Sequence, residues 1–234
     1  MKKISVVVGV WNEEKFIESC LKSISNQTIP RQDYEIIVAD GGSKDNTVKI
    51  AKKYADVVLE GGYKPVGAAR QAGLKKAGGK IVAFTDGDGT VPREWLETMV
   101  KAFEEQGIIC VTGPIECLEK EVPLSIEQAV WIWMKTAKLF TLLNIAGAIG
   151  SNFAVDKKSF MKIGGFRKIK LEDTDASFRL AKIGKLKYLD NIPVKTSVRR
   201  FERWGVIKTM SIGLLANLQV FLGMTPSTDW EKVD

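Results

Sequence analysis

A regular alternation of strand and helix patterns through the first half of the chain constrains the fold most. Residues 4–10 form a continuous apolar run rich in valine, which is typical of a strand buried on both faces. Four further strand patterns follow at 35–39, 57–59, 80–85 and 108–112, with helical patterns between them. This alternation predicts βαβ units, and therefore an α/β fold with a mostly parallel sheet flanked by helices.

The second half of the chain is less regular. We expect a helix over 125–143, with Ser125 in a capping box at its start, and another over 172–182. Short strands are expected within 188–198, and an apolar helix over 204–222. The length of 234 residues suits one core with a smaller region attached to it.

The chain contains no histidine, which excludes Ser-His-Asp and Cys-His catalysis and any histidine-based metal site. A general base must then be a carboxylate, and a metal ion would have oxygen ligands. Its three cysteines, Cys20, Cys110 and Cys117, include no CxxC pair. We therefore expect no disulfide framework and no zinc site, but reduced thiols in a cytoplasmic setting, with a Cys110–Cys117 bridge as the alternative.

The formal net charge of +7 favours an anionic partner. No motif for binding nucleic acid is present, so we expect no nucleic-acid partner, and a phosphate-bearing ligand or a lipid surface fits the charge better. The basic start of the chain precedes an apolar run that is too short for a signal peptide. This agrees with a cytoplasmic location, free or at the cytoplasmic face of the membrane.

Polar residues follow three of the predicted strands at the points where the strands end. Asn12 follows the first strand, Asp40 and Gly41 follow the second, and Asp86 and Asp88 follow the fourth. In open parallel sheets, ligands bind beyond the carboxyl ends of the strands. We therefore expect these three clusters to lie along one edge of the sheet.

The segment Asp86-Gly87-Asp88 predicts a cation site. In an extended segment alternate side chains point the same way, so both carboxylates can reach one Mg²⁺ or Mn²⁺ ion. Such an ion stabilises the charge that develops on a departing diphosphate. The same residue types also form solvated turns, so the pair alone leaves the function open.

Two further clusters carry charge in the second half. Glu172 and Asp173 open a predicted helix, whose N-terminus favours an ionised carboxylate that can act as a base or simply cap the helix. A basic segment, 199–204, combines arginines with aromatic rings that can contact phosphate and sugar or fill the core. Arg70 lies among small residues, where it can contact a phosphate or remain at the surface.

In this order, the clusters resemble the inverting glycosyltransferases of family 2, which have the GT-A fold. The similarity extends from about residue 4 to residue 204 and rests on segments 5–14, 21–28 and 34–45. It implies metal-dependent transfer, with Mg²⁺ or Mn²⁺, of a sugar from a UDP- or GDP-sugar to a glycan, a glycolipid or a polyprenyl phosphate. It leaves open whether the chain forms a homo-oligomer.

The resemblance also implies roles for individual residues. Donor and nucleotide binding falls to Val10, Asn12, Glu14, Asp40, Gly41, Arg70, Asp86 and Gly87, and metal binding to Asp88. Asp173 is the implied catalytic base, and the acceptor side comprises Ser151, Asn152, Glu172, Arg200, Arg203 and Trp204. The family's Gln-x-x-Arg-Trp motif has Arg200 in its first position here, which speaks against a processive polysaccharide synthase.

We accordingly divide the chain into a nucleotide-sugar-binding half over 1–115, an acceptor-binding half with the base over 116–204, and a C-terminal helix over 205–234. The apolar segment 206–224 suits a core or interface helix, a peripheral membrane helix or a spanning helix. Segment 129–143, with two tryptophans and two lysines, could likewise lie at a membrane interface.

Two other functions compete with sugar transfer. A sugar-phosphate nucleotidyltransferase also needs a nucleotide-binding α/β domain and acidic metal ligands. Such enzymes open with a Gly-rich basic loop, whereas the loop at 9–14 here is acidic. A non-catalytic, membrane-associated binding module on the same fold is the other alternative, although it would need no base such as Asp173.

Overall fold

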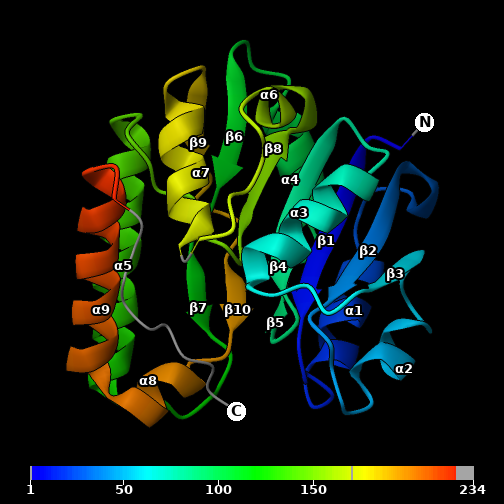
Figure 1. Cartoon of the computed structure of the whole chain (residues 1–234), viewed down its shortest axis with the longest axis horizontal. Coiled ribbons are helices and arrows are strands. Elements are labelled where there is room, and N and C mark those ends of the chain that lie inside the picture. Colours follow the sequence, from blue (N-terminus) through cyan, green and yellow to red (C-terminus); the bar gives the residue numbers. More distant parts are fainter. Residues whose placement is uncertain (1, 170, 225–234) are drawn as a thin grey trace.

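A seven-stranded sheet forms the centre of the protein in the computed structural model, which describes residues 2–169 and 171–224 (Figure 1). The strand order is β3-β2-β1-β4-β8-β6-β9, and only β8 runs antiparallel to its neighbours in this sheet. The strands are β1 (Ile4–Val10), β2 (Tyr34–Asp40), β3 (Val57–Glu60), β4 (Ile81–Asp86), β6 (Ile108–Thr112), β8 (Phe153–Asp156) and β9 (Lys185–Tyr188). The predicted mostly parallel α/β sheet is confirmed.

Both faces of this sheet are buried, because alternate residues of each strand point to opposite sides. On one face Val6 and Val8 of β1 pack in a core with α1 (Ile17–Ser25) and α4 (Trp95–Ala102). On the other face Val7 packs in a second core with helices α3 (Val66–Lys76), α6 (Lys157–Lys162) and α7 (Glu172–Ala181). Two short elements, η1 (Arg31–Asp33) and α2 (Thr47–Ala51), lie at the β2 and β3 side.

A second, three-stranded sheet lies against the carboxyl end of β4. It has the order β5-β10-β7, with β5 (Gly89–Thr90), β7 (Ile115–Cys117) and β10 (Val194–Thr196). Because β5 follows β4 after a tight turn, this small sheet brings the segment after β10 next to the predicted cation site.

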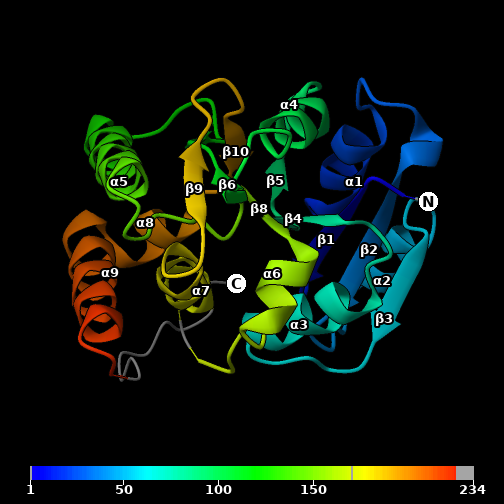
Figure 2. The ribbon, with the colours of Figure 1, turned by 90° about the horizontal axis from the view of Figure 1, so that it is seen from above.

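Three helices complete the smaller region: α5 (Leu124–Leu142), α8 (Arg199–Trp204) and α9 (Val206–Phe221). They share a third core in which Ile126 and Val130 of α5 meet Phe201 of α8. Figures 1 and 2 show α5 and α9 side by side at one end of the molecule, beyond β9 and opposite the β3 end.

Several predicted boundaries were wrong. The capping box at Ser125 is not used, since α5 begins at Leu124 directly after Pro123. The helix predicted over 204–222 is α9, which begins after Gly205; Trp204 is the last residue of α8, because Gly205 has a φ of 78° that interrupts helical geometry. The three cysteines are free thiols, as expected. The predicted C-terminal segment extends past residue 224 and lies in part outside the described residues.

Candidate active site

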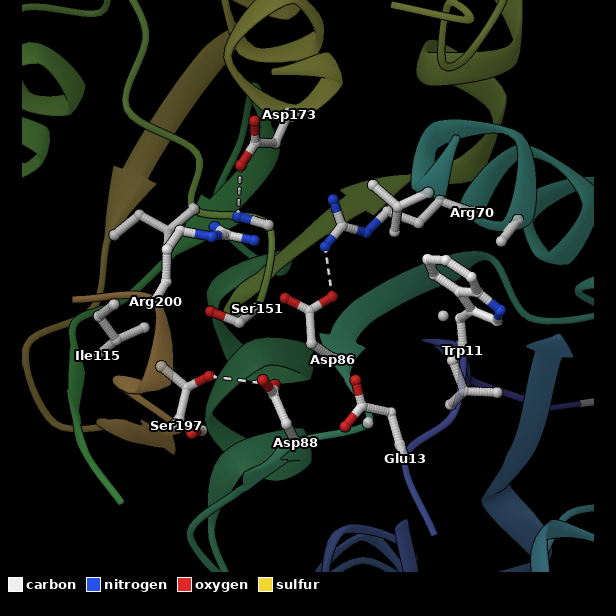
Figure 3. A pocket seen from close by; sticks show the side chains of 18 of the residues that line it. Trp11, Glu13, Arg70, Asp86, Asp88, Ile115, Ser151, Asp173, Ser197 and Arg200 are labelled. Atoms are coloured by element: carbon white, nitrogen blue, oxygen red, sulfur yellow. Dashed lines mark hydrogen bonds and ion pairs between the residues drawn. The ribbon is translucent and has the colours of Figure 1, made fainter. Parts of the chain in front are cut away.

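A cavity of about 490 Å³ opens between the carboxyl ends of β1 and β4, the small sheet, α5 and the start of α7 (Figure 3). The sequence-predicted residues that line it are Val10, Gly41, Arg70, Asp86, Gly87, Asp88, Ser151, Glu172, Asp173 and Arg200. Segments far apart in the chain therefore meet around one space. This is the place that the strand-end argument indicated.

Arg70 joins the two halves of the cavity. Its side chain is only 4% exposed, and its Nη2 donates to Asp86 Oδ1 at 2.5 Å while its Nη1 pairs with Glu172. A buried guanidinium requires such partners, since an uncompensated buried charge costs several kcal/mol. Burial raises the pKa of Glu172 to about 7, although the nearby Arg70 charge opposes the rise. Contact between Arg70 and a diphosphate stays a prediction.

Asp173 stands in the first turn of α7 with both carboxylate oxygens fixed. Oδ2 accepts from the Gly150 amide at 2.7 Å, and Oδ1 accepts from the Thr174 amide at 2.7 Å. A Cβ at Gly150 would lie within 2.9 Å of the Arg70 guanidinium and the Asp173 carboxylate, so a larger residue would have to displace these charged groups. Burial raises the pKa of Asp173, with Arg70 opposing it. The carboxylate is therefore oriented and more basic than an exposed aspartate.

Asp88 lies in the turn between β4 and β5, on the other side of the cavity. Its Oδ2 is 3.2 Å from Arg199 Nη2, and that guanidinium also pairs with Glu13 at 2.5 Å. Burial raises the pKa of Asp88 to about 7, and the neighbouring carboxylates of Asp86 and Glu13 add to the rise. Arg199 thus balances the negative charges of Asp86, Asp88 and Glu13 only in part.

The carboxylates of Asp86, Asp88 and Glu13 suit a divalent cation that enters together with a diphosphate. Within residues 2–169 and 171–224, no three acidic, histidine or cysteine side chains converge into a ready-made metal site. Magnesium in phosphate-transferring sites is held by one or two carboxylates plus substrate phosphate oxygens, so Asp88 with a diphosphate meets the requirement. Burial, followed by the charges of Asp86 and Glu13, raises the pKa of Asp88, and a bound cation would oppose these causes.

Other sequence-predicted residues lie outside the cavity wall: Asn12, Glu14, Asp40, Asn152, Arg203 and Trp204. The Asp40 carboxylate accepts from the amides of Gly42 and Ser43 and from the Ser43 hydroxyl, all within its own turn. Asn12 Oδ1 accepts from the Lys44 amide at 2.8 Å. The loops after β1 and β2 are therefore braced against each other by these side chains.

Glu14 belongs to the same brace, since it accepts from both the backbone and side chain of Asn46 at 3.1 Å. Asn152 is fully buried; it accepts from Trp95 Nε1 and donates to the carbonyls of Pro114 and Ile192, each at 2.8 Å. Asn152 thereby ties three segments behind the cavity. The ring of Trp204 lies 5.4 Å from the Lys208 ammonium, and Arg203 is exposed.

The structure also brings residues into the cavity that the sequence interpretation did not select: Trp11, Glu13, Lys64, Trp133 and Arg199. The Lys64 ammonium lies 3.5 Å from the centroid of the Trp11 ring. Glu13 stood between two selected residues, and the sequence offers no signal that separates it from Glu14. Trp133 follows Val130 by three residues, which places both on one face of α5.

Comparison with known proteins places this arrangement in context. The family model described as "Glycosyl transferase family 2" matches residues 5–164. The glycosyltransferase AglE of Haloferax volcanii is 34% identical over 119 residues, which are 48% of this chain and 39% of that protein. The poly(ribitol-phosphate) beta-glucosyltransferase of Bacillus spizizenii is 40% identical over 104 residues, which are 40% of this chain and 16% of that one.

Among solved structures, the mannosyltransferase PcManGT of Pyrobaculum calidifontis in complex with GDP-Man and Mn²⁺ superposes with a TM-score of 0.71. It is 21% identical, and the match covers 94% of this chain and 63% of that chain. The likeness shows a shared fold. This chain spans less than half the length of the two sequence relatives.

Proposed function

The chain belongs to glycosyl transferase family 2 and has the GT-A fold, and we propose that it transfers a sugar from a nucleoside-diphosphate sugar to an acceptor hydroxyl with inversion. The family assignment supports sugar transfer. Asp173 carries the mechanistic part of the proposal: an oriented carboxylate with a raised pKa beside the cavity.

We assign the nucleotide to the part of the cavity bounded by Trp11, Gly41 and Asp86. The rim at the ends of β1, β2 and β4 supports this, because ligands of such sheets bind there. Solved structures of similar fold hold UDP, UDP-GlcNAc or GDP-Man, so the donor is proposed to be a UDP- or GDP-sugar. Arg70 has a positioning role in this scheme, because it holds Asp86 and Glu172.

Asp88 is the proposed ligand for Mg²⁺ or Mn²⁺, which would stabilise the negative charge that develops on the leaving diphosphate. Structures of similar fold contain Mn²⁺, which supports the assignment. Arg199 lies 3.2 Å from the same carboxylate and holds it in place. The role of Arg199 is to orient Asp88 and limit repulsion between Asp88 and Glu13.

Asp173 is the proposed general base. It takes the proton from the acceptor hydroxyl, whose oxygen attacks the anomeric carbon on the face opposite the diphosphate, so the configuration inverts. The Gly150 and Thr174 amides keep the carboxylate in one orientation throughout. Placing the base and the cation ligand on separate elements separates proton removal from support of the leaving group.

The acceptor is proposed to enter between α5, the small sheet and α8. That wall is largely apolar, with Ile115, Val130, Trp133 and Phe201, and it includes the Arg200 guanidinium. Such a wall suits a glycan, a glycolipid or a polyprenyl phosphate, in which a sugar face or a hydrocarbon accompanies a polar group. The free thiols support a reducing, cytoplasmic setting.

Asp173→Asn tests the proposal. We expect transfer to fall by about 10²–10⁴-fold, because that is what a general base contributes. Donor affinity, measured by calorimetry, should stay within about twofold, and Asp190→Asn, an exposed substitution, should leave both quantities unchanged. Near-normal turnover in the Asp173 variant would remove it as the base. Release of pyrophosphate rather than a nucleoside diphosphate would indicate nucleotidyl transfer instead.

A further inference from the structure

Helix α5 is apolar on both of its long sides. Its inner side packs in the third core through Ile126, Val130 and Met134. Its outer side is also apolar and exposes Leu124, Trp131, Ile132, Leu139, Leu142 and Leu143. Gln128 and Lys135 are exposed among these residues, so the outer side of α5 is apolar with an embedded amide and a charge. Large apolar side chains that gather on an exposed helix side mark a surface that is covered by protein or by lipid.

Helix α9 repeats the pattern. Thr209, Ala216 and Val220 face inward, while Ile207 is 86% exposed and Leu214 is 73% exposed. The remaining large residues on this outer side are Leu215, Leu218 and Leu222. Isolated exposed leucines need no explanation, but a contiguous row of this kind marks an interaction surface.

The two outer sides belong to one surface. The first turn of α5 and the start of α9 share a groove lined by Ile126, Phe201 and Val206, so the helices begin next to each other. Figure 2 shows them side by side along one end of the molecule. Contacts of Phe178 with Phe221 and of Thr174 with Asn217 hold α9 on α7, which fixes which side of α9 faces outward.

The charges on the two helices are mostly basic. Glu127 lies at the start of α5, whereas Lys135, Lys138 and Lys208 lie further along α5 and α9. Lys138 pairs with Asp190 at 2.7 Å, and Glu202 of α8 lines the groove between the two helices, so Lys135 and Lys208 carry the excess positive charge. Lys135 lies 5.3 Å from the ring of Trp131, and Lys208 lies 5.4 Å from the ring of Trp204. Tryptophan beside lysine on an apolar helix is the composition of segments that lie at a lipid–water boundary.

We propose that the outer sides of α5 and α9, here the α5–α9 surface, bind an anionic lipid bilayer with both helices parallel to the membrane plane. None of the helices within the described ranges is long and apolar enough to cross a bilayer. A second copy of the chain is a poorer occupant, because a twofold contact would set the same lysines and a net charge of +7 against themselves.

The position of the surface matters for the cavity. Val130 and Trp133 line the cavity from one side of α5, and Trp131 and Leu139 lie on the side that would contact lipid. The cavity is therefore about one helix diameter, roughly 10 Å, from the membrane surface. Docking itself does not depend on the proposed reaction; a lipid-linked acceptor would be its consequence for the proposed function.

Flotation of the full 234-residue chain with vesicles tests the proposal. We expect binding to vesicles of equal parts phosphatidylglycerol and phosphatidylcholine, and at least tenfold weaker binding to pure phosphatidylcholine. Leu214→Ser with Leu218→Ser should lower the partition coefficient more than tenfold, since buried hydrocarbon drives such binding. Met161→Ser, at an exposed apolar position on α6, which packs on β8, should leave the partition coefficient unchanged.

A charge variant separates the lipid headgroup from the hydrocarbon. Lys135→Gln and Lys208→Gln should each weaken binding to the anionic vesicles about fivefold and leave binding to neutral vesicles unchanged. Unchanged far-ultraviolet circular dichroism and donor binding in every variant would show that the fold is intact. Equal binding by native protein and the Leu214–Leu218 variant would overturn the proposal. So would a dimer that this variant dissociates, with no binding to vesicles.

Discussion

The loops after β1 and β2 and the wall formed by β4, α7 and α8 contribute to the same cavity in opposite ways. In the first, the carboxylates of Asp40 and Glu14 are used by neighbouring backbone and side-chain donors. In the second, burial and mutual repulsion raise the pKa values of Asp88, Glu172 and Asp173. In the first region the carboxylates stabilise the loops, and in the second the negative charges of the carboxylates are only partly balanced by nearby cations. We expect the catalytic residues in the second region, because carboxylates with shifted pKa values are typical of active sites.

Removing Arg70 should have the largest effect on this contrast. Arg70→Met leaves Glu172 and Asp86 without their buried counter-charge, so we expect a loss of about 3–5 kcal/mol in unfolding free energy, measured by urea denaturation. Adding Glu172→Gln should recover part of the loss. If the double variant loses as much unfolding free energy as the Arg70→Met and Glu172→Gln single variants together, the two residues are not coupled. The link between the two regions would then not be electrostatic.

Asp40→Ala should act on the braced region instead. The substitution leaves the Gly42 and Ser43 amides without their acceptor, at a cost of about 2–3 kcal/mol in unfolding free energy. A bracing role predicts that this cost appears without donor, in a thermal or urea melt. A variant of native stability that has lost only donor affinity would instead assign Asp40 to the nucleotide.

Asp88→Asn should stabilise the metal-free protein above pH 7, by about 1–2 kcal/mol. The pKa of Asp88 is about 7 in the folded chain and about 3.9 in an unfolded chain, so the folded form loses stability as pH rises between those values. The advantage of the variant should shrink as pH falls from 8 to 4. In the same variant, added Mn²⁺ with a nucleoside diphosphate should no longer raise the melting temperature.

Ser125→Ala should have the smallest effect, below about 0.5 kcal/mol in unfolding free energy. A helix cap of this kind is worth about 1 kcal/mol, but α5 begins at Leu124 after Pro123 and Ser125 is exposed. The matched substitution Asp156→Ala removes a cap that is used, since Asp156 Oδ1 accepts from the Ser159 amide at 2.7 Å. Equal losses in the two variants would contradict the assigned start of α5.

The sheet could be predicted from sequence because its strands are buried on both faces and read as unbroken apolar runs. Residues 4–10 illustrate this, since every one of them is buried. Strand order was beyond such reasoning: nothing local in Phe153–Asp156 indicates that β8 lies antiparallel between β4 and β6. Pairing over that sequence distance depends on the three-dimensional packing alone.

The site was predictable to a similar depth. Asp86 and Asp88 were selected because two carboxylates at a strand end can share a cation, and Asp173 was selected as the base through the family resemblance; all three line the cavity. The partners of these acids were not predictable from local sequence: Asp88 lies 3.2 Å from Arg199, and the same guanidinium pairs with Glu13, 186 positions away. Residue type and local spacing cannot tell which of two adjacent arginines, Arg199 or Arg200, turns toward the acids.

The place of β8 in the sheet has a consequence for how the chain is made. A ribosome releases β1 to β4 in sequence, and these strands can pair as they emerge. β6 is the next strand of this sheet to be synthesised, but it has no partner among them, because its neighbours are β8 and β9. Until residue 156 has emerged, the growing sheet ends at an open β4 edge, and that interval is when the nascent chain is most exposed to wrong pairing.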